Sequence, residues 1–276
     1  NGERAIAIGL ESVSNGQNAV SVGQKAYAHE HGVAIGSESN AAQAAAIAIG
    51  NKAQAMKYSS IVIGEEAKSN NSRSVVIGYH ASATNPAMSA SNQDTNQTVA
   101  IGAYANAWGD QSTAIGNNVY AKGNSSIAIG SDDWDTVAAK VVDGMSGKTV
   151  KEVYQDYTGD EMRTGKDSYT LTTSGEAAVA IGTKSQATGE LSTAFGTGTR
   201  AEGVASAAFG MGAKATKGNS VAIGAGSTTA TDATKVNEAT VNNLKYSGFA
   251  GGNNINPGDQ VSFGTAGYER QLKNVA

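Results

Sequence analysis

Short apolar runs that end in glycine recur along almost the whole chain. A typical run is Ser220-Val221-Ala222-Ile223-Gly224, and most neighbouring copies are 14 residues apart. The repeat therefore predicts a solenoid in which each copy builds one coil. The glycines that close the thirteen copies are Gly9, Gly23, Gly36, Gly50, Gly64, Gly78, Gly102, Gly116, Gly130, Gly182, Gly196, Gly210 and Gly224.

Each repeat unit contains two extended pieces that are joined by turns. One piece is Ala-x-Ala, as in Ala53-Gln54-Ala55, and the other is the Val-Ala-Ile run. Glycines such as Gly109 and Gly189 fall between the pieces, where turns need residues with permissive backbone angles. Two turns leave room for two strands of about four residues, and no helix fits. The pattern therefore predicts an all-β parallel β-solenoid, with coils stacked about 4.8 Å apart.

The two strands differ in a way that predicts assembly. In Ala-x-Ala the middle residue is polar, as at Gln54, so this strand has one face in water. In Val-Ala-Ile three successive positions are apolar, and the thin interior of one coil covers only one of the two faces. Identical chains around a common axis would cover the other face, and a lid formed by a long insertion is the alternative. We expect the small central residues at the interface between chains, namely Ala48, Ala100, Ala114, Ala128, Ala180 and Ala222.

Composition narrows the class of protein further. Glycine supplies 35 of the 276 residues, but with only 2 prolines the chain is not collagen-like. A formal net charge of −4, with charges interspersed among recurring Val, Ile and Ala, argues against disorder and against a nucleic-acid partner. The absence of cysteine excludes disulfides and thiolate chemistry. The chain begins at Asn1 without a signal peptide, so we expect an excised fragment.

The repeat Ser-Val-Ala-Ile-Gly-x-x-Ala-x-Ala resembles the head of YadA-like trimeric autotransporter adhesins of Gram-negative bacteria. The resemblance covers residues 1 to about 234. Residues 241–251, Val-Asn-Asn-Leu-Lys-Tyr-Ser-Gly-Phe-Ala-Gly, are similar to the head-insert motif of that family. Residues 261–276, which end in Glu-Arg-Gln-Leu-Lys-Asn-Val-Ala, are similar to its neck. Three signatures in the order of the family make the resemblance specific.

The resemblance implies a homotrimer of left-handed parallel β-rolls. The implied domains are a head over residues 1–234, a head-insert motif over 235–260 and a neck over 261–276 that leads to a coiled-coil stalk outside this chain. Two insertions, at about 84–97 and 131–168, interrupt the head. The implied location is the bacterial cell surface, with the membrane reached only through a C-terminal anchor in the outer membrane that is not in this sequence.

The function implied by the resemblance is non-catalytic adhesion. The partner would be a protein or glycan on host cells, in the extracellular matrix or on other bacteria, and the repeat itself does not encode which one. The alternative is a structural spacer that displays a binding site located elsewhere in the full-length protein.

Residues that could carry catalysis or bind a metal are sparse. His29 and His31 form His-x-His, while Asp132, Asp133 and Asp135 lie close together in the sequence. Neither set completes a ligand pattern, and surface polar roles explain both. We therefore expect no enzymatic activity, no metal and no cofactor.

Two further patterns do not change this prediction. Gly196-Thr-Gly and Gly210-Met-Gly echo phosphate-binding motifs, but no helix follows them. A 14-residue period without a threonine ladder also fits neither ice-binding solenoids nor acyltransferases built from hexapeptide repeats.

The second insertion has helical periodicity. Residues 134–142 and 149–157 each place apolar side chains at helical spacing, and Gly144 and Gly147 separate them. We expect a small helical hairpin, in which the apolar residues form a local core or contact a partner. These residues are Trp134, Val137, Val141, Val150, Val153, Tyr154 and Tyr157.

Aromatic residues gather near the middle of the predicted rod. They are candidates for ligand contact because exposed aromatic clusters often mark binding surfaces. Both insertions leave coils that flank this band, so the alternative is that the insertions fold back and bury the rings. The candidates in the band are Tyr79, His80, Tyr104, Trp108 and Tyr120, joined by Trp134, Tyr154 and Tyr157 of the second insertion.

Overall fold

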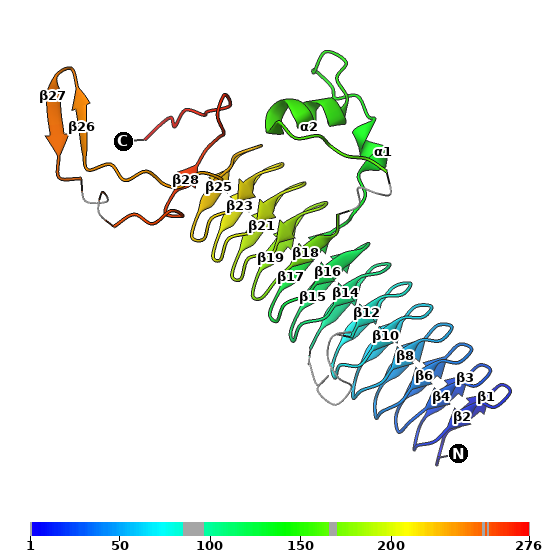
Figure 1. The fold of residues 1–276 in the computed structure, drawn as a ribbon. Coiled ribbons are helices and arrows are strands. Elements are labelled where there is room, and N and C mark those ends of the chain that lie inside the picture. The colour runs from blue at the N-terminus through cyan, green and yellow to red at the C-terminus, as the bar shows by residue number, and fades with distance from the viewer. Residues whose placement is uncertain (1, 85–96, 166–169, 250–251, 253, 276) are drawn as a thin grey trace. The chain divides into compact units, whose positions relative to one another are not determined.

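The computed structural model describes residues 2–84, 97–165, 170–249, 252 and 254–275 (Figure 1). The chain forms two compact units. Unit 1 comprises residues 1–132 and 170–184, and unit 2 comprises residues 133–169 and 185–276. Each unit contains stacked coils of parallel strands, and the two units together hold about 14 turns of β-solenoid. The predicted all-β parallel solenoid is therefore confirmed.

Unit 1 contains two parallel sheets, one from each extended piece of the repeat. Neighbouring strands pair in register one coil apart, as Ile47, Ala48 and Ile49 do with residues 61–63. The Val-Ala-Ile sheet contains, in order, β1 (Ile6–Ile8), β3 (Val20–Val22), β5 (Val33–Ile35), β7 (Ile47–Ile49), β9 (Ile61–Ile63), β11 (Val75–Ile77), β13 (Val99–Ile101), β15 (Thr113–Gly116), β17 (Ile127–Gly130) and β19 (Val179–Ile181). The Ala-x-Ala sheet contains β2 (Val13–Ser14), β4 (Tyr27–Ala28), β6 (Asn40–Ala41), β8 (Gln54–Ala55), β10 (Lys68–Ser69), β12 (Ser82–Ala83), β14 (Asn106–Ala107), β16 (Val119–Ala121) and β18 (Thr172–Ser174).

Unit 2 repeats the same two sheets and adds irregular elements. Its Val-Ala-Ile sheet contains β21 (Thr193–Phe195), β23 (Ala207–Phe209), β25 (Val221–Ile223) and β28 (Val261–Ser262), and its Ala-x-Ala sheet contains β20 (Gln186–Ala187), β22 (Arg200–Ala201) and β24 (Lys214–Ala215). The additions are helices α1 (Asp135–Ala138) and α2 (Val150–Thr158) and the antiparallel hairpin β26 (Glu238–Val241) and β27 (Leu244–Ser247). The hairpin falls within the head-insert motif that the sequence predicts, and β28 begins the predicted neck by pairing with β25.

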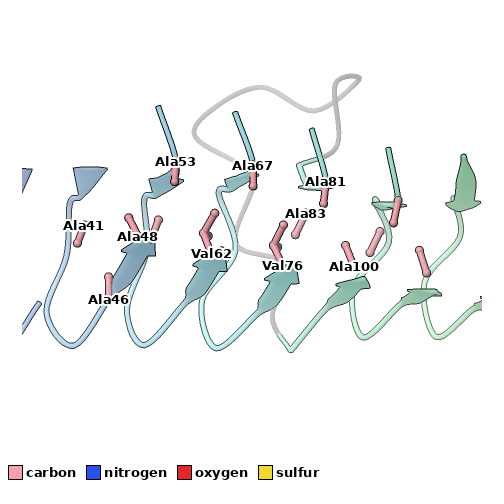
Figure 2. Close-up of a cluster of buried hydrophobic side chains, with 14 of the residues drawn as sticks. Ala41, Ala46, Ala48, Ala53, Val62, Ala67, Val76, Ala81, Ala83 and Ala100 are labelled. Carbon is pink, nitrogen blue, oxygen red and sulfur yellow. The ribbon is translucent and has the colours of Figure 1, made fainter. Parts of the chain in front are cut away.

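The interior of each coil is thin and is filled by small side chains. In the run from Ser220 to Gly224, Ser220 and Ala222 are fully buried, whereas Ile223 is exposed. The Ser220 hydroxyl donates to the Lys217 carbonyl at 2.7 Å, which satisfies its buried polar group. Figure 2 shows the resulting stack in unit 1, where only Val62 and Val76 replace alanine on the Val-Ala-Ile strands drawn. The core of the coils is therefore built mainly from Ala, Ser and Thr, with an occasional Val.

The glycine that closes each run is required by the close stacking of coils. Gly50 has a φ of 133°, a value that essentially only glycine adopts. A Cβ atom at this position would also lie 2.5 Å from the Gly64 carbonyl oxygen in the next coil. The repeat glycine is therefore fixed by both backbone conformation and space.

The second insertion contains less helix than its periodicity predicts. The region predicted as residues 134–142 forms only α1, and an antiparallel bridge then joins Val141 to Thr149. The β-branched Val141 and Val142 favour this extended path, and the turn between the two bridged segments carries Gly144 and Gly147 with positive φ. Helix α2 forms where it is predicted, behind a capping box in which Thr149 and Glu152 bond to each other's backbone N–H.

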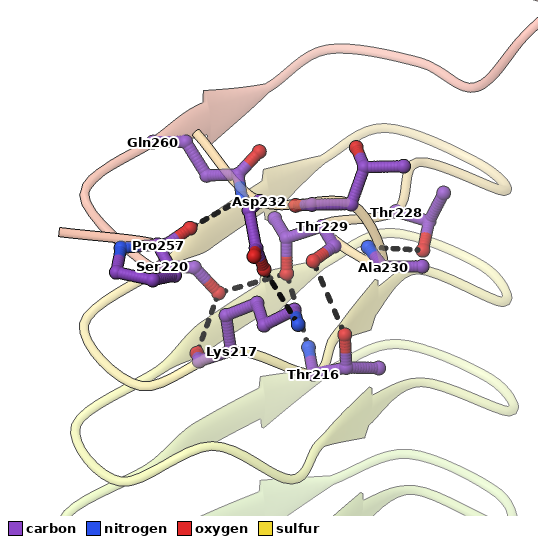
Figure 3. A network of polar contacts seen from close by, with 10 residues as sticks. Thr216, Lys217, Ser220, Thr228, Thr229, Ala230, Asp232, Pro257 and Gln260 are labelled. Atoms are coloured by element: carbon purple, nitrogen blue, oxygen red, sulfur yellow. Dashed lines mark hydrogen bonds and ion pairs between the residues drawn. The ribbon is translucent and has the colours of Figure 1, made fainter. Parts of the chain in front are cut away.

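Polar contacts close the last coil of unit 2 (Figure 3). Lys217 pairs with Asp232 at 2.7 Å, and the hydroxyls of Ser220 and Thr229 lie 2.8 Å apart. The Gln260 amide donates to the Thr231 carbonyl at 2.6 Å. Farther along the chain, the Arg270 guanidinium donates to the carbonyls of Ala225 and Phe263. These contacts satisfy backbone groups that a bare solenoid end would leave open.

Candidate functional surfaces

The Val-Ala-Ile sheet exposes its largest side chains rather than burying them. The first and third residues of these strands point away from the interior, because successive side chains of a strand alternate between faces. We call these outward positions the apolar stripe. In unit 1, Ile8 is 59% exposed and Ile35 is 39% exposed, and in unit 2 Phe195 is 51% exposed. An apolar surface that continues from coil to coil marks an interaction surface rather than ordinary exterior.

The central alanines lie on the opposite side of these strands from the stripe. The sequence predicts Ala48, Ala100, Ala114, Ala128, Ala180 and Ala222 at an interface between chains. Each of them is 0% exposed within the single chain, where it lines the interior of its coil. A partner chain has no access to these side chains, so the expectation is corrected: any interface on this sheet uses their Val, Ile and Phe neighbours.

Side-chain volume is balanced across the stripe of unit 2. The registered first positions are Thr193, Ala207 and Val221, and the registered third positions are Phe195, Phe209 and Ile223. In the two strands whose third residue is the large Phe, the first residue is the smaller Thr or Ala. In the strand whose third residue is the medium-sized Ile, the first residue is the medium-sized Val. Such compensation is expected where side chains share one packed volume.

The aromatic residues of unit 1 form two ring clusters rather than one band. The first, which we call the turn cluster, contains Tyr79, His80 and Tyr104. The His80 and Tyr104 rings are stacked with centroids 5.2 Å apart, and Tyr79 lies edge-on to both at 4.2 and 5.4 Å. Tyr79 and Tyr104 remain 45% and 42% exposed. Residues 85–96 of the first insertion lie outside the described residues, so the position of this insertion relative to the rings stays a prediction.

The second ring cluster lies on the outward face of the Ala-x-Ala sheet. The Trp108 and Tyr120 rings meet at an interplanar angle of 80°, with centroids 5.1 Å apart. The Lys122 ammonium lies 6.0 Å from the Tyr120 centroid. All three side chains project from neighbouring strands or from the turns that follow them, and both rings are half-buried. The sheet therefore holds these rings in a fixed arrangement.

Two of the three aromatic candidates in the second insertion belong to a local core. Trp134 and Tyr154 are buried with ring centroids 5.5 Å apart, and Met162 and Ala138 complete the cluster. The Trp134 indole N–H donates to the Arg163 carbonyl at 2.6 Å. Burial raises the pKa of Tyr154, as expected for a phenol removed from water.

Other residues predicted for this core lie at the surface or join it only in part. Tyr157, Val137 and Val141 are exposed. Val150 packs against the cluster, as does Met211 from a coil of unit 2. Met162 and Met211 were not predicted, because isolated methionines carry no periodic signal.

Helix α2 lies on a row of three glycines in the coils of unit 2. Each is the second residue after a repeat glycine and has a positive φ. A Cβ atom on Gly198 would lie 2.7 Å from the Tyr154 hydroxyl, and one on Gly212 would lie 2.6 Å from the Thr158 methyl. A Cβ atom on Gly226 would lie 2.6 Å from the Tyr157 carbonyl oxygen. We call these three residues the glycine row.

The same position in unit 1 takes a positive φ without glycine. Its residues there are Glu11, Lys25, Glu38, Lys52, Glu66, His80, Tyr104, Asn118 and Lys184. The left-handed conformation alone therefore does not require glycine at this position. Glycine is required in unit 2 because helix α2 covers the turn and leaves no room for a Cβ atom. The Gly-x-Gly spacings that begin at residues 196, 210 and 224 are the sequence signal for the place where helix α2 docks. Comparing these spacings with phosphate-binding motifs did not reveal this role.

Titratable residues form no metal-binding arrangement within the part of the chain that the structure describes. No group of three or more His, Cys, Asp or Glu side chains there is arranged to hold a metal ion. His31 lies 3.7 Å from Glu30, and the buried Asp132 accepts a hydrogen bond from the Asn118 amide. Across the described ranges, none of the helices has the length and apolar character that crossing a bilayer requires.

Comparison with known proteins agrees with the geometry of the coils. The family model described as YadA head domain repeat (2 copies) matches residues 1–26, 30–53, 57–81, 96–118, 174–199 and 201–227, more than half of the chain. A comparison with the curated proteins returned no match. Members of this family are non-enzymatic adhesins. Because the matched stretches are the coils that build both solenoid units, the chain belongs to the YadA head family.

Proposed function

We propose that this chain is the head of a homotrimeric bacterial surface adhesin, built from left-handed β-rolls. The observation that carries the proposal is the apolar stripe, which a single chain leaves in water on one sheet of both units. Burial of apolar area is worth roughly 25 cal/mol per Å², so a stripe repeated in every coil supplies a large driving force for association. A closed ring of three chains would bury the same stripe of every copy, as cyclic symmetry requires.

In this proposal the head works by display. A stiff solenoid holds its surface side chains at fixed spacing, and trimerisation presents each patch three times. Weak contacts with a host or bacterial surface then add through avidity. We propose the turn cluster and the second ring cluster, formed by Trp108 and Tyr120, as the surfaces for contact. Tyr157 is the exposed aromatic candidate of the second insertion. The head is proposed to stand outside the cell, anchored in the outer membrane as in other members of the family.

Assembly is tested by placing single thiols on the two sheets. The chain has no cysteine, so Ile49→Cys introduces one thiol on the stripe and Gln54→Cys one on the polar sheet. We expect a short bismaleimide to cross-link Ile49→Cys chains and to leave Gln54→Cys chains uncross-linked. Light scattering of the unmodified chain should give the mass of a trimer. A stable monomer, or equal cross-linking of the two variants, would remove the basis of the proposal.

A second pair of variants separates folding from assembly. Ile101→Lys changes an outward residue and should weaken the trimer while each coil keeps its interior. Ala100→Asp buries an unpaired carboxylate in that interior, and it should lower the melting temperature whatever the oligomeric state. If Ile101→Lys leaves the trimer intact, the stripe is not the interface.

Adhesion is tested with the trimer displayed on a non-adherent bacterium. Attachment is measured to extracellular-matrix proteins, host cells and other bacteria, with and without residues 133–165. Attachment by the head alone supports the adhesin. A head that forms trimers but attaches to none of these surfaces supports the alternative, in which it is a spacer for a binding site elsewhere.

A further inference from the structure

The turn cluster occupies one ridge of unit 1, where the first turn of each coil follows the Val-Ala-Ile strand. His80 and Tyr104 are the second residues after their repeat glycines, and both have a positive φ. The shared conformation aligns their rings along the stacking direction, with planes only 3° apart. Tyr79 is perpendicular to both rings, and the three centroid distances place it beside the stack rather than on top of it. The Tyr79 side chain is almost half exposed, so part of it is available for contact.

Polar groups suited to hydroxyl ligands extend the ridge on one side of the rings. In the preceding coil, Glu65 accepts a hydrogen bond from the Asn51 amide at 3.2 Å. Glu66 lies 3.8 Å from Lys52 and 3.5 Å from His80, so its charge is already balanced. The neighbouring Tyr104 hydroxyl, followed by burial and by the negative charges of Glu65 and Glu66, raises the pKa of Tyr79.

Amide groups extend the same ridge on the other side of the rings. Asn117 and Asn118 occupy the first turn of the coil after Tyr104. The Asn117 side-chain oxygen accepts a hydrogen bond from the Ala103 N–H at 3.2 Å, which leaves its amide N–H₂ available to a ligand. The ridge is therefore aromatic at its centre, with carboxylates on one side and amides on the other.

We propose that the turn cluster binds a neutral, unbranched oligosaccharide that runs along the ridge. This inference rests on the proposed adhesin function and names the ligand class of one of its contact surfaces. An aromatic face packs against the C–H face of a pyranose ring, while carboxylate and amide groups bond to its hydroxyls. Coils repeat about every 4.8 Å, close to the length of one pyranose unit, so successive sugars of a linear chain meet successive turns.

The charged side chains of the ridge favour a neutral oligosaccharide over an anionic glycan or a basic peptide. The Glu65 carboxylate, whose partner is the neutral Asn51 amide, would repel a sialylated or sulfated glycan. A basic peptide would have to compete with Lys52 and His80 for Glu66, and on an exposed surface such an ion pair adds little free energy. A neutral sugar meets neither obstacle.

The test uses ligand-observed NMR titration of the trimer with cello-, chito- and poly-N-acetyllactosamine oligosaccharides, each as di-, tetra- and hexasaccharide. We expect affinity to rise from the di- to the tetrasaccharide in at least one series. Tyr79→Ala combined with Tyr104→Ala should weaken binding about tenfold or more, as loss of central aromatic contacts does. The control, Tyr58→Ala, removes an exposed tyrosine that lies outside both ring clusters, and it should bind like the unmodified head. Tyr79→Leu keeps the apolar volume but removes the ring face. This variant should also bind the oligosaccharide more weakly, and it replaces the double variant if that variant misfolds.

Three results would overturn the inference: no binding of any neutral oligosaccharide, equal binding by the turn-cluster and control variants, or preference for a sialylated hexasaccharide or an Arg/Lys peptide. Its failure is distinguishable from failure of the adhesin function. A trimer that attaches cells equally well with and without Tyr79 and Tyr104 remains an adhesin that uses another surface. A head that neither forms trimers nor attaches would refute the proposed function itself.

Discussion

One residue position in the coil serves two different purposes. The second residue after every repeat glycine except Gly130 has a left-handed conformation, which costs an L-residue roughly 1–2 kcal/mol. In unit 1 this position carries Glu, Lys, His, Tyr or Asn, and their side chains form the ridge with the turn cluster. In the coils under helix α2 it carries glycine, because a Cβ atom would enter the helix. Glycine at this position therefore marks a turn on which a helix rests, whereas a side chain here does not by itself mark an open turn, since Lys184 is only 4% exposed.

Replacing one residue of the glycine row tests this account. Gly212→Asn keeps a residue type that tolerates the left-handed conformation but places a side chain against Thr158. We expect a loss of roughly 1–3 kcal/mol in the free energy of unfolding, as for overpacked interiors. The measurement is urea unfolding, with Lys52→Asn as the matched control at an open turn. Equal stability of Gly212→Asn and the unmodified chain would show that the helix does not rest on this glycine.

The two faces of the Val-Ala-Ile strand show what alternation can and cannot predict. Alternation correctly predicts that Ala100 points away from Val99 and Ile101. It does not say which face is inside, because both are apolar and a shift of one residue exchanges them. The size of the side chains decides: an interior that admits Ala and Val but nothing larger leaves Ile and Phe outside. Close packing of two short strands, rather than hydrophobicity, therefore determines the orientation.

At the scale of elements, helix α2 was predictable in full, whereas the prediction over residues 134–142 was right only for the single turn of α1. Helix α2 has the Thr149 and Glu152 capping pair and a glycine, Gly159, in the left-handed conformation at its end. The segment after α1 has neither a cap nor a stop signal, and two β-branched residues draw it into the bridge with Thr149. The docking of α2 on the glycine row depends on residues far away in sequence, so local periodicity could not reveal it.

The capping box predicts a pH dependence for the insertion. The backbone N–H and then the hydroxyl of Thr149, both donating to the carboxylate at 2.7 Å, lower the pKa of Glu152 from its ordinary value of 4.5. The stabilisation is therefore complete above pH 4.5 and is lost as the pH falls through the lowered folded-state pKa. We expect the emission of the buried Trp134, recorded in a Trp108→Phe background, to shift to the red over this acidic range.

The control for this pH dependence is Glu152→Gln. Its uncharged amide oxygen can still accept a hydrogen bond from Thr149, so the helix cap persists without a titrating group. The acidic shift of Trp134 emission should be reduced in this variant. An unchanged shift would show that the capping box is not its cause.

At the scale of the whole molecule, the repeat makes stability a sum over neighbouring coils. Each coil of unit 1 pairs only with the coil before it and the coil after it. The solenoid was therefore predictable from period alone, as was the alternation of its two sheets. The number of chains in the assembly was not predictable from the period, because it depends on how the apolar stripe of one chain packs against the stripes of other chains.

Deleting one whole coil tests this modular stability. Removal of residues 50–63 takes out β8 and β9 and joins Ile49 directly to Gly64, so the 14-residue period continues. We expect the shortened chain to fold with a slightly lower melting temperature by circular dichroism. Removal of residues 50–56, half a coil, would bring polar strands opposite apolar ones and should prevent folding of the coils around the junction. Similar behaviour of the two deletions would contradict a stack of independent coils.

The glycine row also means that the second insertion could be transferred to another head of this kind. A helix that rests on three successive turns needs only that those turns carry no Cβ atom and that a local core holds its own residues together. The same segment grafted into another head of this kind would therefore require three glycine substitutions, one per coil, and a methionine at the place of Met211, which packs against its core. Conversely, glycine at this position in successive coils of a related sequence would predict a segment that covers those turns. Turns that hold a docked segment could then be recognised along a head from its repeat alone.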